Sequence, residues 1–351
     1  IEADPAAHIR LSGRSGVFID GTIRAPAGKI DVLLAGNSAG QKQTVQSIQS
    51  RIWLGPNSRL LAPGAEKIDP VNNLGLRIGE VLDAGQVNIA AEYGSVLGAR
   101  SAEINVDAVS SRLDLQNNGI RTSREVGGAA GEINFTAAES FAYSGKLSAQ
   151  SVLDQPGGRL SFNLDPTNRG AEAPDTAPNA INLFYHGEFT AVMDDYSGTL
   201  PGTAGTVGPD LLGHAYIPVS QVASGGFDAL DVRVRDSRPT AGSVSPDTTD
   251  SLPVVEFTRD TTLQLDRRLT LDAAVIRIDG DHDVMLDAPY IALGSTNNRP
   301  LEGSIPETRE ESPGIYIDNT AVLTLTPTSG PGSLRVEADL VELVGEMVTQ
   351  G

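Results

Sequence analysis

The segments LTLDAAVIRI, from Leu269 to Ile278, and VMLDAPYIAL, from Val284 to Leu293, share one order of residue types. Each has an apolar stretch, then an aspartate and an alanine, then a second apolar stretch. Alternation with a period of two indicates a strand with one apolar face. A small residue between two such strands lets the chain turn sharply. The segments therefore predict pairs of strands joined at a corner, with Ala273 and Ala288 as the corner residues.

Related patterns recur along the chain. LRVEADLVEL, from Leu334 to Leu343, has Ala338 at the corner, and INVDAV begins a further copy at Ile104. A shorter pattern consists of a glycine followed by alternating polar and aliphatic or phenylalanine residues. Its copies start at Gly28, Gly85, Gly131, Gly158 and Gly332. Each copy predicts a short strand entered from a glycine turn.

Such internal repetition favours a stack of similar units. Parallel strands in a stack lie about 4.8 Å apart, so each strand satisfies the backbone groups of its neighbours. An antiparallel sandwich or barrel is the alternative, but its strands usually differ from one another. We therefore predict an all-β fold, a right-handed parallel β-helix (solenoid), that spans residues 1–351 as a single segment of a larger exoprotein.

Irregular stretches interrupt the repeats near residues 165–222, 236–252 and 295–314. They are rich in Pro, Gly, Ser, Thr and Asp, a composition that cannot build a separate core. We expect these insertions to leave the stack as surface loops that lie along one flank or remain mobile.

Charge and composition exclude several classes of protein. Lys and Arg total 26 against 45 Asp and Glu, so the net charge of −19 repels nucleic acids and anionic membranes. No apolar run approaches the roughly 18 residues that a membrane-spanning helix needs. The chain has no cysteine, which excludes disulfides, thiolate metal sites and cysteine catalysis. Absence of cysteine also fits export of an unfolded chain through an oxidising compartment.

Four phrases carry a resemblance to a known family: RIWLGPNSRLLAPGA from Arg51, VASGGFDALDVRV from Val222, RRLTLDAAVIRI from Arg267 and LRVEADLVEL from Leu334. In these phrases the chain resembles the filamentous haemagglutinin family of large exoproteins, the TpsA-like proteins of two-partner secretion. The Asn-rich motifs of the family's secretion domain are missing, so we expect the sequence to begin downstream of that domain.

The resemblance implies a right-handed β-helix, secreted or held at the cell surface of a Gram-negative bacterium, that an outer-membrane transporter exports. It implies a structural and adhesive shaft, acting in adhesion, cell aggregation or biofilm formation, with no catalytic residues. Its partners would be a host receptor, a neighbouring cell or an extracellular polysaccharide, without nucleic acid binding or membrane insertion. Two alternatives stay open: a β-helix enzyme that degrades polysaccharides, and a passive carrier segment of a contact-dependent toxin-delivery exoprotein.

One acidic turn is a candidate metal site. In the sequence IDGDHDV, Asp279, Asp281 and Asp283 alternate around Gly280. Several carboxylate oxygens close together suit Ca²⁺, so these three residues form a candidate calcium site. An ordinary solvated turn is the alternative, and no other cofactor is expected.

Other polar and aromatic residues have weaker signals. Asp194 and Asp195 form a carboxylate pair that could act as acid and base, although a surface turn is the simpler interpretation. Trp53 could either fill the solenoid interior or face outward as a platform that stacks on a sugar ring, and alternation with Ile52 and Leu54 favours the outward position. Metal-ligand spacing is lacking for the four histidines, which are His8, His186, His214 and His282.

Overall fold

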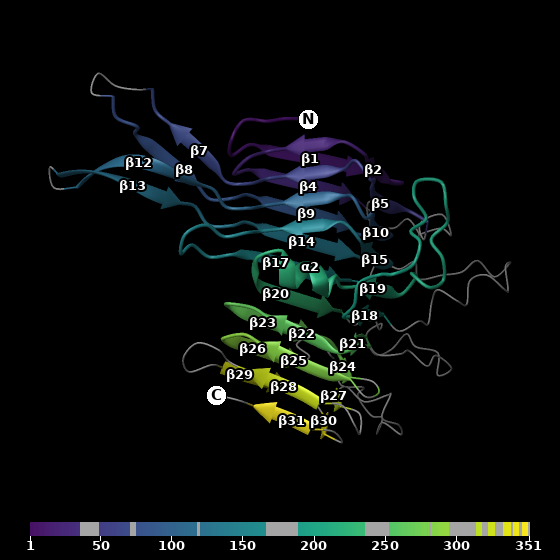
Figure 1. Ribbon diagram of the computed structural model, residues 1–351. Coiled ribbons are helices and arrows are strands. Elements are labelled where there is room, and N and C mark those ends of the chain that lie inside the picture. The colour runs from purple at the N-terminus through teal and green to yellow at the C-terminus, as the bar shows by residue number, and fades with distance from the viewer. Residues whose placement is uncertain are drawn as a thin grey trace, which may run out of the picture.

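The structure is a computed structural model, and it is all-β, as predicted. Strands make up 53% of the chain and helices 3%. The described residues are 1–35, 49–70, 75–117, 120–165, 189–235, 253–278, 280, 282–294, 314–317, 322–326, 333–337, 340–343 and 346–349. From residue 314 onward only the course of the strands is described. Most strands belong to long parallel sheets that stack from the N-terminus to the C-terminus (Figure 1).

The first sheet has nine parallel strands. In spatial order they are β1 (His8–Gly13), β4 (Lys29–Leu34), β9 (Gln86–Ala91), β14 (Glu132–Ala137), β17 (Gly158–Leu164), β20 (Phe227–Val234), β23 (Arg268–Asp272), β26 (Tyr290–Gly294) and β29 (Ser333–Glu337). One shift of register interrupts the pairing, between Gly158 and Arg159, where β17 meets β20. Elsewhere inward residues pair with inward residues, as Ile30 does with Val87.

The second sheet has ten parallel strands. In spatial order they are β2 (Val17–Ile19), β5 (Arg51–Leu54), β10 (Ser95–Gly98), β15 (Ser140–Tyr143), β19 (His214–Tyr216), β18 (Thr190–Val192), β21 (Val254–Phe257), β24 (Val275–Ile278), β27 (Gly314–Ile317) and β30 (Leu340–Leu343). Only β18 and β19 depart from chain order, because β19 lies between β15 and β18.

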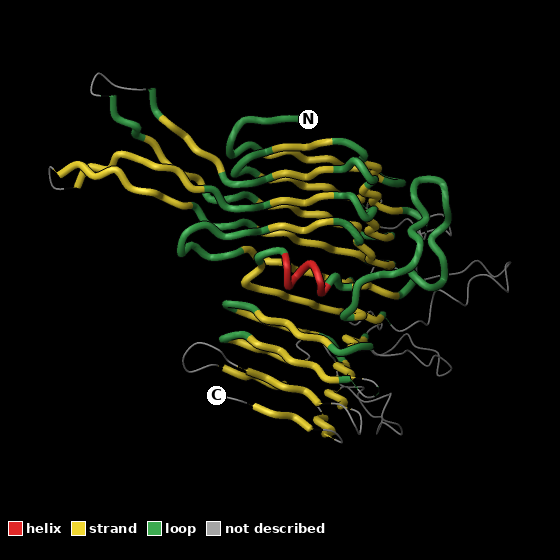
Figure 2. Tube along the Cα trace, viewed as in Figure 1, coloured by secondary structure: helices red, strands yellow, loops and turns green. Residues whose placement is uncertain are grey.

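A third face consists of two four-stranded parallel sheets with a short helix between them (Figure 2). One sheet contains β3 (Thr22–Arg24), β6 (Arg59–Leu61), β11 (Glu103–Asn105) and β16 (Lys146–Ser148). The other contains β22 (Thr261–Gln264), β25 (Asp283–Asp287), β28 (Val322–Thr326) and β31 (Glu346–Thr349). Helix α2 (Val219–Ser224) contacts both β16 and β22. Within the described ranges, no helix is long and apolar enough to cross a membrane.

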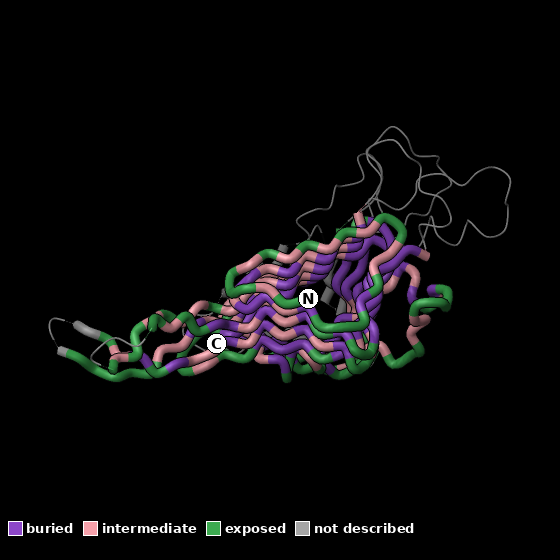
Figure 3. Tube along the Cα trace, turned by 90° about the horizontal axis from the view of Figure 1, so that it is seen from above, coloured by how far each residue is buried: buried purple, intermediate pink, exposed green. Residues whose placement is uncertain are grey.

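The chain passes through the first sheet, the second sheet and the third face in a repeating order. We call one such set of consecutive elements a triplet; β4, β5 and β6 form one, and β9, β10 and β11 form the next. Each strand of a triplet pairs in parallel with its counterpart in the next triplet. Viewed along the stack, the strands of successive triplets lie over one another (Figure 3).

Two of the three predicted alanine corners lie where the sequence predicts them, and the third, at Ala338, lies outside the described residues. Ala273 and Ala274 are buried between β23 and β24, and Ala288 is buried between β25 and β26. The two copies of the pattern nevertheless occupy different corners. The first joins the first sheet to the second, whereas the other joins the third face to the first sheet. The recurrence therefore reflects what a buried corner requires, and it does not mark the length of one repeat.

Inward side chains from the three faces form one continuous core. Every second residue of β4, β9 and β14 is buried. Aromatic rings stack along the core in the middle of the molecule. The rings of Phe135 and Phe162 are 5.4 Å apart and nearly parallel, and that of Phe141 lies 4.8 Å from Phe135. Contacts of this kind between like side chains join each triplet to the next.

The glycine pattern has a steric cause. A Cβ atom built on Gly85 would lie 1.8 Å from the carbonyl oxygen of Gly28, and one on Gly131 would lie 2.0 Å from that of Gly85. On Gly28 it would lie 2.2 Å from the carbonyl oxygen of Ala7. Successive triplets therefore approach too closely at this corner for any side chain.

Two antiparallel hairpins were not predicted. They are β7 (Ala65–Ile68) with β8 (Gly79–Leu82), and β12 (Ser110–Asn117) with β13 (Ile120–Gly127). Both project from the same side of the stack, and together we call them the arm (Figures 1 and 3). Arg77 joins the hairpins: its backbone N–H donates to Asp114 Oδ2 (2.8 Å), and its Nη2 donates to Glu66 Oε2 (2.6 Å). An Asn-Gly pair at 118–119, between two alternating runs, was the overlooked hairpin signal.

The predicted insertions fall only in part within the described residues. Residues 166–188, 236–252 and 295–313 lie outside them. The described part of the first insertion, from residue 189, contains β18, β19 and the start of α2, none of which was predicted. Residues 194–213 lie along the second sheet, where Val207 and Leu211 pack against Trp53.

Substitution of Gly85 tests the close approach of neighbouring triplets. We expect Gly85→Ala to lower the free energy of unfolding by about 1–3 kcal/mol, because the added methyl group collides with backbone. Gly21→Ala is the matched control, since a Cβ there meets nothing within 4 Å. Chemical denaturation of both variants measures the effect, and equal losses would contradict the steric explanation.

Candidate binding surface

The outward residues of the first sheet form rows that run across the strands. One row contains Lys29, Gln86, Glu132 and Arg159. The next row contains Asp31, Asn88, Asn134 and Ser161. In-register pairing places these polar side chains side by side on an open face, where they can bond to one another and to a ligand.

Hydrogen bonds connect the second of these rows. Asn134 Nδ2 donates to Asn88 Oδ1 (2.9 Å), and Asn88 Nδ2 donates to Asp31 Oδ1 (2.6 Å). At the end of the row, Asp31 Oδ2 lies 2.7 Å from Nε2 of His8. Nζ of Lys29 lies 3.5 Å from Asp31 Oδ1. The row is thus a ladder of amides that ends on a carboxylate.

The environment of Asp31 changes its acidity. Burial opposes ionisation, but the hydrogen bonds from Asn88 and His8 and the charge of Lys29 outweigh it. The pKa of Asp31 is therefore lower than that of an ordinary aspartate, and the ladder stabilises the ionised form.

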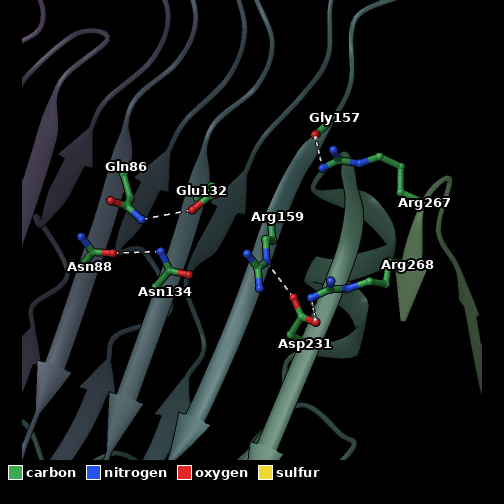
Figure 4. A network of polar contacts seen from close by, with 9 residues as sticks. All are labelled: Gln86, Asn88, Glu132, Asn134, Gly157, Arg159, Asp231, Arg267 and Arg268. Atoms are coloured by element: carbon green, nitrogen blue, oxygen red, sulfur yellow. Dashed lines mark hydrogen bonds and ion pairs between the residues drawn. The ribbon is translucent and has the colours of Figure 1, made fainter. Parts of the chain in front are cut away.

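In the first row, Gln86 Nε2 donates to Glu132 Oε2 (3.1 Å). Further along the same face, ion pairs replace the amides (Figure 4). Asp231 accepts from two arginines, Nε of Arg159 (2.7 Å) and Nη2 of Arg268. These three residues come from the adjacent strands β17, β20 and β23. A carboxylate shared in this way holds both guanidinium groups in place.

Three more arginines surround this centre. Each forms an ion pair with an aspartate, with the distance measured from a guanidinium nitrogen to a carboxylate oxygen. The pairs are Arg233 with Asp272 (3.0 Å), Arg235 with Asp165 (3.0 Å) and Arg267 with Asp228 (3.8 Å). Arg267 also donates from Nη2 to the carbonyl oxygen of Gly157 (3.4 Å). The face therefore changes along the stack from neutral amides to arginines. Such a flat, extended surface suits an elongated ligand better than a small molecule.

The second sheet has a different outer face, because residues 194–213 form a strap over it. Trp53, Leu97 and Ala142 point away from the core and pack against Val207 and Leu211 of the strap. Trp53 faces outward, as predicted, but it is only 7% exposed. The predicted role of Trp53 as a platform for sugar stacking is therefore wrong, because the strap covers the indole ring.

Arg51 fastens the strap to β5. Its Nη2 donates to the carbonyl oxygens of Thr203 (2.9 Å) and Gly205 (2.8 Å), and its Nη1 donates to that of Gln49 (3.3 Å). Gln49 Oε1 in turn accepts from the backbone N–H of Val207 (2.8 Å). Arg51 is buried, and burial lowers its pKa. A buried guanidinium group held by carbonyl oxygens makes loss of the strap costly.

The candidate calcium site falls mostly outside the described residues. Asp279 and Asp281 are not described. Asp283 is the first residue of β25, and its backbone N–H donates to Asp260 Oδ1 (3.0 Å). Within the described residues, no three His, Asp or Glu side chains gather closely enough to hold a metal ion. The calcium site thus remains a prediction.

The carboxylate pair forms an ion pair. Nη2 of Arg259 lies 2.6 Å from Asp194 Oδ1 and 3.2 Å from Asp195 Oδ2. Ser220 Oγ also donates to Asp195 Oδ1 (2.9 Å). Next to the pair, burial and the hydrogen bond to Asp210 raise the pKa of Tyr196 to about 12. These contacts attach the start of the strap to the stack, which favours the surface interpretation of the pair.

The described histidines lie apart from one another. His8 contacts Asp31 at the end of the amide ladder. The ring of His214, in β19, stacks on that of Tyr216, with 6.2 Å between the ring centroids. Nδ1 of His282 lies 3.6 Å from Oδ1 of Asp260. His186 lies outside the described residues.

An open groove lies beside the base of the arm. Its volume is about 620 Å³, and its walls include Glu2, Asp4, Arg24 and Glu66. Three of these four charged residues are already paired, because Arg24 Nη1 donates to Glu2 Oε1 (2.9 Å) and Arg77 Nη2 donates to Glu66 Oε2 (2.6 Å). The groove offers acidic walls without a converging set of free donors.

Sequence reasoning missed the arginine centre. The signal was present, since Arg159, Asp231 and Arg268 all fall on the polar positions of alternating strands. Which polar positions become neighbours depends on the pairing between strands far apart in the chain, and the insertions hide that register. Comparisons with protein-family models, with curated proteins and with solved structures find no match to this chain.

Release of the strap has a direct optical signal, because Trp53 is the only tryptophan. We expect Arg51→Gln to remove the bonds to Thr203 and Gly205, to expose the indole ring and to shift its fluorescence to longer wavelength. Cleavage by protease within residues 194–213 should also become faster. Arg100→Gln, at an exposed position, is the control. An unchanged spectrum and cleavage rate for Arg51→Gln would show that the strap is held by other contacts.

Asp31 should make stability depend on pH. Its pKa is lowered in the folded state, so its contribution is present above the pKa of an unfolded aspartate and is lost as pH falls through the folded pKa. Asp31→Asn should therefore be less stable than the parent protein at neutral pH, and the difference should vanish in acid. Thermal unfolding across this pH range measures it, and a difference that grows in acid would contradict the assignment.

Proposed function

We propose that the three faces wind together as a right-handed parallel β-helix in an exoprotein similar to the filamentous haemagglutinin family. The support is the triplet order, in which each sheet receives one strand per passage of the chain and pairs it in parallel. Connections between parallel strands are right-handed in nearly all proteins, which supports the proposed hand.

On this proposal the protein is a structural and adhesive shaft. The observation that carries it is the in-register parallel pairing of β4, β9 and β14 with their neighbours. Such pairing gives a rigid column, about 40 Å tall for nine strands at strand spacing. A rigid column with polar rows on an open face suits holding a ligand at a distance from a cell. The proposed role is adhesion, cell aggregation or biofilm formation.

The proposed location is outside the cell or at the surface of a Gram-negative bacterium, with export by an outer-membrane transporter. The lack of cysteine among all 351 residues supports this route. The proposed contacts are a host receptor, a neighbouring cell or an extracellular polysaccharide. A carrier segment of a toxin-delivery exoprotein has the same column, and cell binding by the isolated protein distinguishes an adhesin from it.

A polysaccharide-degrading enzyme is the second candidate. Arg159, Asp231 and Arg268 converge from three adjacent strands, as such enzymes require of their catalytic groups. Against catalysis, Asp231 is occupied by both arginines. Incubation with polygalacturonate tests this candidate. A lyase would raise the ultraviolet absorbance through new unsaturated sugar ends, and a hydrolase would raise the number of reducing ends; sustained turnover by either route would replace the adhesive proposal.

Adhesion can be measured with beads coated with the purified protein. We expect folded protein to make the beads adhere to epithelial cells or to aggregate bacterial cells, because the outward rows are then presented together. Beads coated with urea-unfolded protein are the control. Absence of adherence to either kind of cell, with the protein folded on the beads, would refute the adhesive role.

A further inference from the structure

In the arginine ion pairs of the first sheet, the arginine reaches the surface further than its aspartate, as the basic partner does in most ion pairs of the described residues. In the arginine patch, the side chains of Arg159, Arg233, Arg235, Arg267 and Arg268 are 39–49% exposed. Their four aspartates are only 5–19% exposed. In the pair of Arg24 with Glu2, by contrast, the carboxylate is 72% exposed. A ligand that approaches the patch therefore meets guanidinium groups first.

The patch is much less acidic than the protein as a whole. Its five arginines stand against Asp165, Asp228, Asp231 and Asp272, with Glu132 beside Arg159 and Asp266 close to Asp228, so the local charge is near zero. The whole chain carries −19. Because a charged group acts most strongly on what lies nearest, the exposed guanidinium groups decide which ligand charge this face attracts.

The centre of the patch is organised for anionic groups. Asp231 accepts one bond from Arg159 and one from Arg268. An arginine has five N–H donors in a planar fork that fits carboxylate or sulfate oxygens, so one bond to Asp231 leaves donors on each arginine. Asp231 also fixes the directions of both side chains, which reduces the entropy lost when a ligand binds.

The neighbouring strands supply groups that suit sugars. On one side lie the amides of Asn88 and Asn134, which can bond to hydroxyl groups. On the other side, Tyr290 of β26 is the register partner of Arg268 and is partly exposed. Between the two arginines, Ala229 of β20 leaves the row flat. Amide, arginine and aromatic side chains thus follow one another along the stack, in this order from β9 to β26.

We propose that the arginine patch binds an acidic polysaccharide, whose carboxylate or sulfate groups bond to Arg159 and Arg268 and whose chain lies along the stack axis. This inference rests on the proposed adhesive function and names the ligand class. Nucleic acid suits the face less well. Its dense phosphate charge would be repelled by the rest of the acidic protein, whereas a sparsely charged sugar chain can use the amides as well.

The test compares the binding of polygalacturonate, dextran sulfate and uncharged dextran to the full chain. The variant Arg159→Gln/Arg268→Gln should lose roughly tenfold or more in affinity for the charged polymer. The control Arg112→Gln/Arg121→Gln removes the same charge from the arm and should bind like the parent. Arg159→Lys/Arg268→Lys keeps the positive charges but lacks the planar set of N–H donors, so it should bind the charged polymer with intermediate affinity. If the glutamine variant does not fold, the affinity of the lysine variant tests the inference.

Binding of polygalacturonate alone assigns the ligand to uronates, and binding of dextran sulfate alone assigns it to sulfated sugars. Equal binding of uncharged dextran, tighter binding of duplex DNA, failure to bind either charged polymer, or parent-like binding by the lysine and glutamine variants would overturn the inference. The adhesive function is judged separately. Coated beads that adhere equally well with the glutamine variant refute the patch alone, whereas beads that never adhere refute the adhesive function.

Discussion

The close approach of successive backbones is the constraint on which the rest of the structure depends. Parallel strands must lie about 4.8 Å apart for their amides and carbonyls to bond, and this spacing applies to the corners as well as to the sheets. At the glycine corner, the carbonyl oxygen of Gly28 occupies the space where Gly85 would carry a side chain. At the alanine corners, Ala273 and Ala288 turn the chain within the core. Only small residues are compatible with both spacing and burial, which is why these two residue types recur in the sequence.

Backbone pairing and core packing together leave the outward positions free for other uses. Inward residues such as Ile30, Val87 and Ile133 must be apolar, since they are fully buried. The outward residues, which alternate with them, need only avoid steric and electrostatic conflict with their neighbours on the adjacent strands. On the second sheet these positions are covered by the strap that Arg51 holds. On the first sheet they remain open, and there they form the amide ladder and the arginine patch. The two faces therefore differ because of what lies over them, although their backbones are alike.

Local patterns predicted the strands and corners well, because alternation and small residues act within a few positions. The parallel stacking followed from the resemblance between the repeats. What could not be predicted depends on distant pairing. Asp231 meets Arg159 and Arg268 because β20 pairs with β17 and with β23, which lie far from it in the chain. Burial of Trp53 likewise depends on Val207 and Leu211, which lie far away in the chain. The arm was predictable in part, since Asn-Gly between alternating runs is a hairpin signal.

The arginine patch lies at the level where the stack is least regular. In the triplet of β17, the third face has α2 in place of a strand, and the second sheet contains both β18 and β19. A helix is about 10 Å across, and two strands span about the same distance, whereas the first sheet has β17 alone at this level. Two faces are thus taller than the first sheet, and the strands below this level are inclined to those above it (Figure 1). On the first sheet, the register of β17 and β20 shifts at this level between Gly158 and Arg159, and the backbone N–H of Gly157 donates to Asp228 Oδ2 (2.6 Å). Arg159 and Asp228 are members of the arginine patch, so the departure from regular stacking and the patch lie at the same level of the stack.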